Sequence, residues 1–250
     1  MATFSSDGVE IAYLDEGEGD AVVLVHGFAS TMTVNWIDTG WVRILRTAGY
    51  RVVALDNRGH GGSAKLYGPE DYGAPLMAED VRRLMDHLGI RRADIIGYSM
   101  GARIAAFLAL AHPERVRSLV FGGLGGNMVR PMAGTGPIAH ALEADSIEAV
   151  KNPTARTFRA FAEQTGSDLK ALAACIRSAR DPLTPAALAT IEVPVLVAVG
   201  SEDVIGGSAG DLARLMAKGE ALVIERRDHM KAVGDRQFKD GVIAFLARRP

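Results

Sequence analysis

Cysteine and basic runs are scarce in this 250-residue sequence, and both absences narrow what the chain can do. Its one cysteine, Cys175, cannot form an internal disulfide, which favours a reducing compartment. No run of basic residues is longer than a pair, and the formal net charge is −2. The sequence therefore lacks the positive patch that binds nucleic acid or an anionic membrane, and we expect neither partner.

Long apolar stretches and metal-ligand spacings are absent as well. No uninterrupted apolar run reaches about 18 residues, the length that a membrane-spanning helix needs, and the opening MATFSSDGVE has no basic and apolar signal segment. The histidines and the cysteine are not spaced as metal ligands, and the glycines of FGGLGGN open no clear helix, as a dinucleotide site would require. The sequence predicts a cytoplasmic protein that uses no metal and no cofactor.

Apolar segments of strand length alternate with helical patterns along most of the chain. A run such as AVVLVHG, without polar alternation, is typical of a strand covered on both faces. The order strand, helix, strand predicts an α/β protein with a parallel sheet between two layers of helices. Strands are expected at 9–17, 21–27, 51–56, 93–98, 116–123, 193–200 and 221–226, and helices at 36–48, 76–88, 100–111 and 209–217.

One long segment interrupts this alternation. Between residues 127 and 190 there is no apolar strand run, only short helical patterns separated by prolines. The sheet pattern resumes at VPVLVAVG, so we expect an insertion above the carboxyl edge of the sheet and not a separate domain. The prediction is a core of residues 1–126 and 191–250 with a small helical cap over 127–190.

The stretch GYSMG, residues 97–101, places Ser99 between two glycines where a predicted strand becomes a predicted helix. A strained turn of this kind, the nucleophile elbow, lifts a serine hydroxyl above the end of a sheet, and small neighbours let the helix pack closely. A glycine-rich chain can produce G-x-S-x-G by accident, but the flanking strand and helix supply the context that the motif requires. Ser99 is therefore the candidate nucleophile.

A serine nucleophile needs a base within hydrogen-bonding reach and an acid that orients the base. Of the six histidines, His229 directly follows the last predicted strand, where a loop can carry a base to the carboxyl edge of the sheet. Glu202 and Asp203 follow the strand before it, and we prefer Asp203 as the acid. Asp228 is disfavoured, because neighbouring side chains in an extended turn point apart.

These segments together resemble the α/β-hydrolase fold superfamily, in particular its serine esterases and lactonases. The resemblance implies a mostly parallel eight-stranded sheet flanked by helices, with a small helical cap. It also implies that Asp203 holds Nδ1 of His229 while Nε2 takes the Ser99 proton. The backbone N–H groups of Phe28 and Met100 would receive the oxyanion. The likeness is carried by HGFAS, DNRGHGGS, GYSMGA, AHPERVRSLV, VGSEDVI and DHM.

The resemblance implies carboxylic ester hydrolysis through an acyl-enzyme, on short to medium acyl esters, lactones or polyesters. Ser99 argues against the aspartate-nucleophile chemistry of dehalogenases and epoxide hydrolases. A pyruvate-eliminating lyase stays open, because GYSMGAR is similar to the elbow of the menaquinone-pathway synthase. Meta-cleavage C–C bond hydrolases and enol-lactone hydrolases resemble the chain as well. In the lyase, Arg103 would bind an anionic substrate together with cap arginines taken from Arg130, Arg156, Arg159, Arg177 and Arg180. A small-molecule receptor that retains the triad is a further alternative.

Substrate contacts are expected from apolar side chains of the cap and of the loop after the second strand. The candidates are Phe28, Met128, Met132, Phe158 and Phe161. They would form an acyl pocket, although each is also of the type that packs a cap onto a core. The expected partner is a small-molecule ester.

Overall fold

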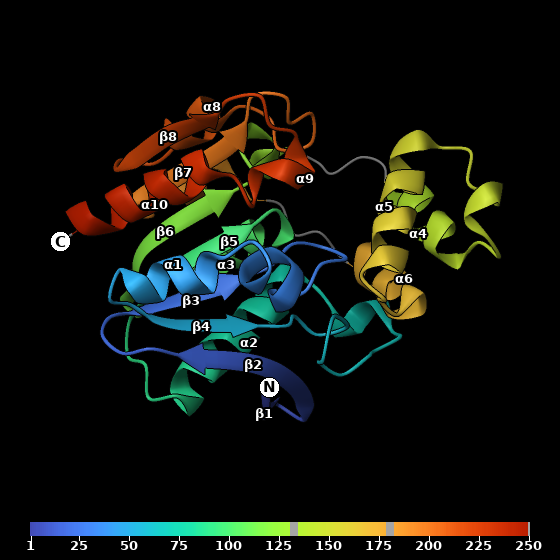
Figure 1. Ribbon diagram of the computed structural model, residues 1–250, viewed down its shortest axis with the longest axis horizontal. Coiled ribbons are helices and arrows are strands. Elements are labelled where there is room, and N and C mark those ends of the chain that lie inside the picture. The colour runs from blue at the N-terminus through green and yellow to red at the C-terminus, as the bar shows by residue number, and fades with distance from the viewer. Residues whose placement is uncertain (131–134, 179–182, 250) are drawn as a thin grey trace.

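The computed structural model describes residues 1–130, 135–178 and 183–249, and its centre is one eight-stranded sheet (Figure 1). The strand order is β1-β2-β4-β3-β5-β6-β7-β8. β2 pairs antiparallel with β1 and β4, and the other pairs are parallel. The predicted α/β class and eight-stranded, mostly parallel sheet are confirmed. The strands are β1 (Ala2–Ser6), β2 (Val9–Glu16), β3 (Ala21–Val25), β4 (Arg51–Leu55), β5 (Ala93–Tyr98), β6 (Val116–Gly122), β7 (Val195–Gly200) and β8 (Gly219–Ile224).

Helices cover both faces of the sheet and its carboxyl edge. The helices are α1 (Trp41–Thr47), α2 (Ala74–His87), α3 (Met100–Ala111), α4 (Thr135–Glu143), α5 (Pro153–Gln164), α6 (Leu169–Arg177), α7 (Pro185–Leu188), α8 (Ala209–Ala213), α9 (His229–Ala232) and α10 (Arg236–Arg248). α1 and α10 pack on one face, and α2, α3 and α8 on the other. The inserted helices α4, α5 and α6 lie beyond the carboxyl ends of the parallel strands (Figure 1). No described helix is long and apolar enough to span a membrane.

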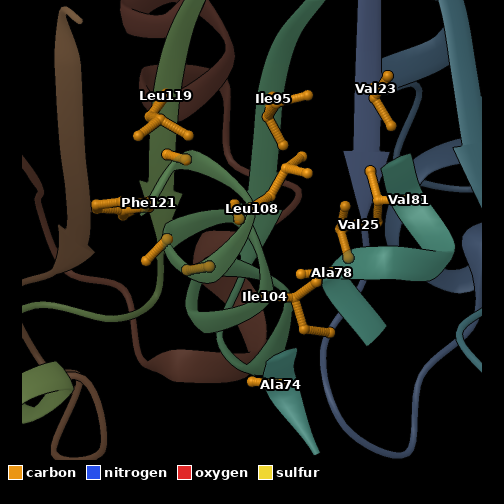
Figure 2. Close-up of a cluster of buried hydrophobic side chains, with 14 of the residues drawn as sticks. Val23, Val25, Ala74, Ala78, Val81, Ile95, Ile104, Leu108, Leu119 and Phe121 are labelled. Atoms are coloured by element: carbon orange, nitrogen blue, oxygen red, sulfur yellow. The ribbon is translucent and has the colours of Figure 1, made fainter. Parts of the chain in front are cut away.

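Two apolar clusters enclose the sheet, because successive strand residues point to opposite faces. In β3, Val23 and Val25 pack with α2 and α3, whereas Val22 and Leu24 pack with residues of α1 and α10. Figure 2 shows the first of these clusters, with Ile104 of α3 among the strand side chains. All the β3 side chains are buried, as its unbroken apolar sequence predicts.

The sequence patterns miss β1, the short helix α9 and α10, and they misplace the helix predicted at 36–48. β1 is short and largely exposed, and it joins β2 through a turn at Asp7 and Gly8, which both have positive φ. α10 buries one face through Phe238, Val242, Phe245 and Leu246, an i, i+4, i+7, i+8 spacing that is typical of an amphipathic helix and that the sequence analysis does not use. The helix predicted at 36–48 is a π-helical turn over Thr33–Ile37 followed by α1, and the two are separated at Gly40, whose φ is 82°.

The two glycines that flank Ser99 leave no room for a side chain. A Cβ on Gly97 would lie 2.2 Å from the carbonyl oxygen of Gly101. A Cβ on Gly101 would lie 2.0 Å from the carbonyl oxygen of Val25. Both obstacles are backbone atoms, so the glycines are what lets α3 start directly against β5 and β3.

Gly101→Ala is expected to destabilise the fold by about 3 kcal/mol, because a methyl group would have to displace backbone in a close-packed layer. Gly136→Ala is the matched control, since a Cβ there meets no atom within 4 Å. Urea unfolding followed by circular dichroism measures both. Equal midpoints for the two variants would show that α3 can move away from the strands without cost.

Candidate active site

Ser99 lies at the turn between β5 and α3, with φ 54° and ψ −111°. A residue with a β-carbon rarely adopts this conformation, which stores about 1–3 kcal/mol of strain. The Ser99 N–H donates to the carbonyl of Gly122 at 2.7 Å, which ties the turn to β6. The turn has the strained strand-to-helix geometry that the GYSMG motif predicts.

His229 and Asp203 meet Ser99 at the carboxyl edge of the sheet. Nε2 of His229 lies 3.0 Å from Oγ of Ser99, and Nδ1 lies 2.8 Å from Oδ2 of Asp203. Asp203 follows β7 and His229 begins α9, just after β8. The structure thus brings the three residues predicted from the sequence into one chain of hydrogen bonds.

The Asp203 carboxylate is fully enclosed and held from both sides. Its side chain has no exposed surface, and Oδ1 accepts the backbone N–H groups of Ile205 and Gly206, both at 2.8 Å. Backbone donors of this kind stabilise the ionised form of a carboxylate. Oδ2 is left to accept the Nδ1–H of His229, which orients the imidazole with Nε2 toward Ser99.

The neighbouring acids have other roles. Glu202 is exposed, and only its backbone joins the turn, through an N–H bond to the carbonyl of Arg227. Asp228 is the N-cap of α9 and accepts the N–H groups of Met230 and Lys231. The choice of Asp203 over both follows from this geometry.

Tyr98 is a residue of the site that the sequence interpretation does not identify. Its hydroxyl donates to the backbone carbonyl of His229 at 2.6 Å, and its ring lies 5.6 Å from the imidazole. Burial raises the pKa of this hydroxyl well above its usual range, so it remains a donor at neutral pH. Tyr98 therefore fixes the backbone of His229 beside Ser99.

The two predicted oxyanion donors are the backbone N–H groups of Phe28, which lines the cavity beside Ser99, and of Met100, the residue after Ser99. Met100 is the first residue of α3, where backbone N–H groups have no intrahelical acceptor and the helix dipole is positive. Phe28 follows Gly27, whose N–H donates to Oδ1 of Asn35 at 2.9 Å. Within the described residues, neither the Phe28 nor the Met100 N–H donates to another group. Both are free to bind an oxyanion.

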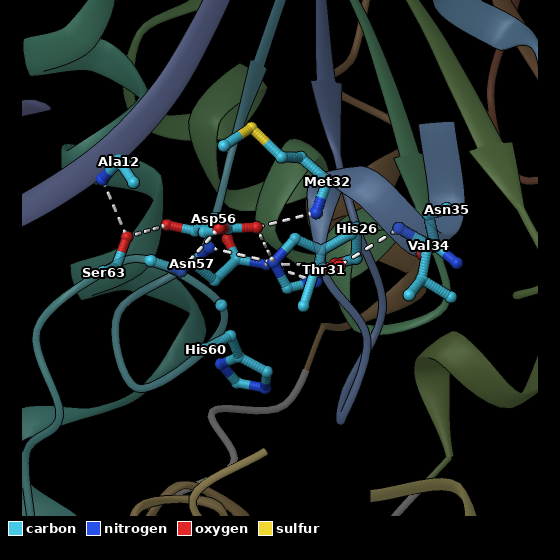
Figure 3. Close-up of polar contacts among 12 residues, drawn as sticks. Ala12, His26, Thr31, Met32, Val34, Asn35, Asp56, Asn57, His60 and Ser63 are labelled. Atoms are coloured by element: carbon cyan, nitrogen blue, oxygen red, sulfur yellow. Dashed lines mark hydrogen bonds and ion pairs between the residues drawn. The ribbon is translucent and has the colours of Figure 1, made fainter. Parts of the chain in front are cut away.

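A buried polar network joins the segment around His26 and Met32 to Asp56 and Asn57 (Figure 3). The Asn57 N–H donates to Nε2 of His26 at 2.9 Å, so Nδ1 carries the proton and donates to the Gly27 carbonyl at 2.7 Å. Burial lowers the pKa of His26 to about 4 and that of His60 to about 3. Both rings are therefore neutral at pH 7. Across the described ranges, no group of three or more His, Cys, Asp or Glu side chains is placed to hold a metal ion.

A cavity of about 160 Å³ opens beside Ser99. Its walls include Ser99 and His229 on the core side and Phe158 and Phe161 of α5 on the opposite side. Phe28 lies between them, with its ring 6.0 Å from that of Phe158. A cavity of about 150 Å³ can hold benzene, so this space fits a group of about six heavy atoms. Three of the five predicted substrate contacts line it.

The other two predicted substrate contacts are not found there. Met128 is fully buried in the cluster that contains α3, and its carbonyl accepts Nη2 of Arg103 at 2.9 Å. Met128 therefore packs in the core, which is the alternative that the sequence analysis left open for each of these residues. Met132 lies outside the described residues. Arg103 is only 5% exposed and does not line the cavity, so its position does not suit a substrate contact.

Two arginines of the insertion, Arg159 and Arg177, bind to groups of the inserted helices themselves. Arg159 is buried and donates to the carbonyls of Ala141 and Ala144 at the end of α4, at 2.6 and 2.8 Å. Arg177 pairs with Glu143. Arg130 and Arg156 are exposed, and Arg180 lies outside the described residues. None of the described ones lines the cavity, so no guanidinium of the described residues is placed there to bind an anion.

Comparison with known proteins identifies the family. The profile of the alpha/beta hydrolase fold matches residues 20–174, more than half of the chain. The chain belongs to the α/β-hydrolase fold family. The predicted resemblance is confirmed. The fold alone names neither the reaction nor the substrate.

Similar proteins act on different substrates. A solved structure described as "Est816 as an N-Acyl homoserine lactone degrading enzyme" superposes with a TM-score of 0.77 and 24% identity, covering 98% of this chain and 100% of that one. The 2-hydroxy-6-oxo-6-phenylhexa-2,4-dienoate hydrolase of Comamonas testosteroni is 36% identical over 131 residues, 49% of this chain and 43% of that protein. Bifunctional epoxide hydrolase 2 of Rattus norvegicus is 33% identical over 113 residues, 45% of this chain and 20% of that protein. The chain spans less than half the length of either curated relative.

Proposed function

We propose that this α/β hydrolase cleaves carboxylic esters, with Ser99 as nucleophile, His229 as base and Asp203 as the acid that orients the base. The observation that carries the proposal is the pair of hydrogen bonds, 3.0 and 2.8 Å long, that joins the three side chains at the edge of a cavity. A serine hydroxyl is a weak nucleophile at neutral pH, and a neutral imidazole at this distance is the base that activates it.

In the acylation step, Oγ of Ser99 attacks the ester carbonyl carbon while Nε2 of His229 takes the hydroxyl proton. Asp203 stabilises the imidazolium that forms. The carbonyl oxygen becomes an oxyanion and accepts the N–H groups of Phe28 and Met100, each worth about 3–4 kcal/mol in the transition state. His229 then returns its proton to the departing alkoxide, which leaves as the alcohol, and the acyl group stays on Ser99.

In the deacylation step, His229 takes a proton from water, and the hydroxide attacks the acyl carbon through the same oxyanion geometry. The Ser99–acyl bond breaks, the proton returns to Oγ, and the carboxylic acid leaves. Acyl transfer of this kind needs no cofactor. The mechanism requires only that the acyl group fit beside Ser99.

The cavity supports neutral acyl groups of short to medium length. No described residue that lines it is charged at neutral pH apart from His229 when it holds a proton, and Phe28, Phe158 and Phe161 present apolar rings. Its volume of about 160 Å³ accommodates an acyl group of about six heavy atoms. Small esters and lactones meet both conditions.

A second candidate is hydrolysis of a C–C bond, favoured by the 36% identity over 131 residues with the Comamonas testosteroni hydrolase. The lyase alternative has less support, because Arg103 donates to the Met128 carbonyl and stands away from the cavity. A receptor that retains the triad would bind its ligand and turn it over negligibly.

A panel of p-nitrophenyl esters from two to twelve carbons tests the substrate class, run beside a lactone and a 2-hydroxy-6-oxo-dienoate. We expect kcat/KM to be highest at four to six carbons and about tenfold lower at ten. Phe161→Ala widens the cavity and should shift the optimum to longer chains, whereas Gln164→Ala, exposed on the same helix, should not. Turnover of the dienoate alone would replace the ester proposal with the C–C hydrolase. Tight binding without turnover of any substrate would favour the receptor.

A further inference from the structure

The end of α5 is tied to the loop that carries the Phe28 N–H. Thr165 is the C-cap of α5, and its Oγ1 lies 3.0 Å from the carbonyl oxygen of Ala29. The same hydroxyl lies 3.1 Å from the Ala162 carbonyl and 2.8 Å from Oγ of Ser167. Ser167 can donate to Thr165, which leaves the Thr165 proton for the two carbonyls. Of these contacts, only the bond to Ala29 joins the end of α5 to a distant segment of the chain.

Ala29 needs this support because its backbone is strained. Its φ is 59°, in the left-handed region that residues with a β-carbon rarely adopt. Such a conformation persists only where the surrounding structure holds it. Ala29 is fully buried and packs with residues of the inserted helices, Ala162 and Leu172 among them. The conformation of the loop therefore depends on contacts supplied by the insertion.

The same helix also forms the far wall of the cavity. Phe158 and Phe161 of α5 face Ser99 across it, and the Phe158 ring lies against that of Phe28. One turn later, Thr165 bonds to the residue that follows Phe28. α5 thus contacts both the acyl space and the backbone of the oxyanion loop.

We propose that Thr165 is a positioning residue, whose hydrogen bond to Ala29 holds the Phe28 N–H in the direction of the oxyanion. The inference rests on the proposed ester hydrolysis. The Phe28 N–H belongs to the peptide group whose carbonyl, that of Gly27, is held by His26 Nδ1 from one side. The Thr165 bond holds the strained backbone on the other side, and without it Ala29 can relax and shift the Phe28 N–H from the place where charge develops. An interaction made only in the transition state affects kcat and leaves substrate binding unchanged.

Thr165→Val tests this, because valine keeps the shape of the side chain and removes the hydroxyl. We expect kcat for a four-carbon ester to fall about tenfold with KM unchanged, and Thr165→Ser to restore it. Thr157→Val is the matched control on the same helix, since that hydroxyl bonds only to the Pro153 carbonyl within α5. Active-site titration with a fluorophosphonate counts the competent enzyme, so that kcat refers to folded protein.

A kcat for Thr165→Val within twofold of Thr157→Val would overturn the positioning role while leaving the ester hydrolysis intact. The same holds if Thr165→Ser is as slow as Thr165→Val, or if the loss appears in KM. Wild-type protein that turns over no ester, or turnover that survives Ser99→Ala, would instead overturn the proposed function and the positioning role together.

Discussion

Ser99→Ala is expected to lower ester turnover by about 10⁴- to 10⁶-fold and to leave the fold intact. His229→Ala should cost about as much, because each removes the step in which the hydroxyl loses its proton to Nε2 across 3.0 Å. The two residues act as a unit, so the double variant should be little worse than either single one. Alanine at position 99 also keeps the small side chain that the strained turn accommodates.

Steady-state rates on the four-carbon ester compare the turnover of each variant with that of wild type. The urea midpoint of each variant shows whether its fold is intact. Ser5→Ala and His140→Ala are matched controls, since both side chains are exposed and neither lines the cavity beside Ser99. Turnover within a few-fold of wild type in Ser99→Ala, from a preparation free of host esterases, would exclude Ser99 as the nucleophile. Mass-detected acylation of Ser99 by the ester provides a direct second measurement.

Asp203→Asn is expected to lose about 10⁴ in kcat near neutral pH while KM changes little. The amide oxygen can still accept the N–H groups of Ile205 and Gly206, which should keep the loop in place. The amide nitrogen then faces Nδ1 of His229 and donates to it, so the imidazole carries its proton on Nε2. In that tautomer the ring cannot take a proton from Ser99.

Glu202→Gln is the matched control, because the same change one residue earlier alters an exposed side chain. It should retain wild-type turnover. A benign Asp203→Asn together with a crippled Glu202→Gln would mean that the other carboxylate orients the base. The pH dependence of kcat for both variants separates a tautomer defect from a loss of folded protein.

Much of the fold was predictable because it rests on local patterns. Buried parallel strands produce unbroken apolar runs such as that of β3, and the elbow needs glycine where backbone meets backbone. The positions of Asp203 and His229 followed from the rule that parallel strands end at one edge of a sheet. The pairing of these residues in space agrees with that reasoning, and their chemistry stays a prediction for the variants above.

The contacts that the sequence could not indicate join distant segments. The Tyr98 hydroxyl meets the His229 carbonyl across 131 residues, and Thr165 meets Ala29 across 136. Tyr98 lies in an apolar strand and Thr165 at the end of a helix, where these residue types are common. Nothing in their local sequence therefore indicates the distant contact. Met128 is a similar case, because an apolar side chain near the site suits both the core and a pocket, and only packing distinguishes them.

The spacing of the triad along the chain has a consequence for how activity arises during folding. His229 bonds to Asp203 across 26 residues but to Ser99 across 130. Loop-closure entropy makes the longer contact about 1.4 kcal/mol more costly to form from an unfolded chain. The acid and base can therefore pair before the hydroxyl reaches them. Because Asp203 follows β7 and His229 follows β8, a refolding chain cannot bring the three side chains together until both strands have joined the sheet beside β6.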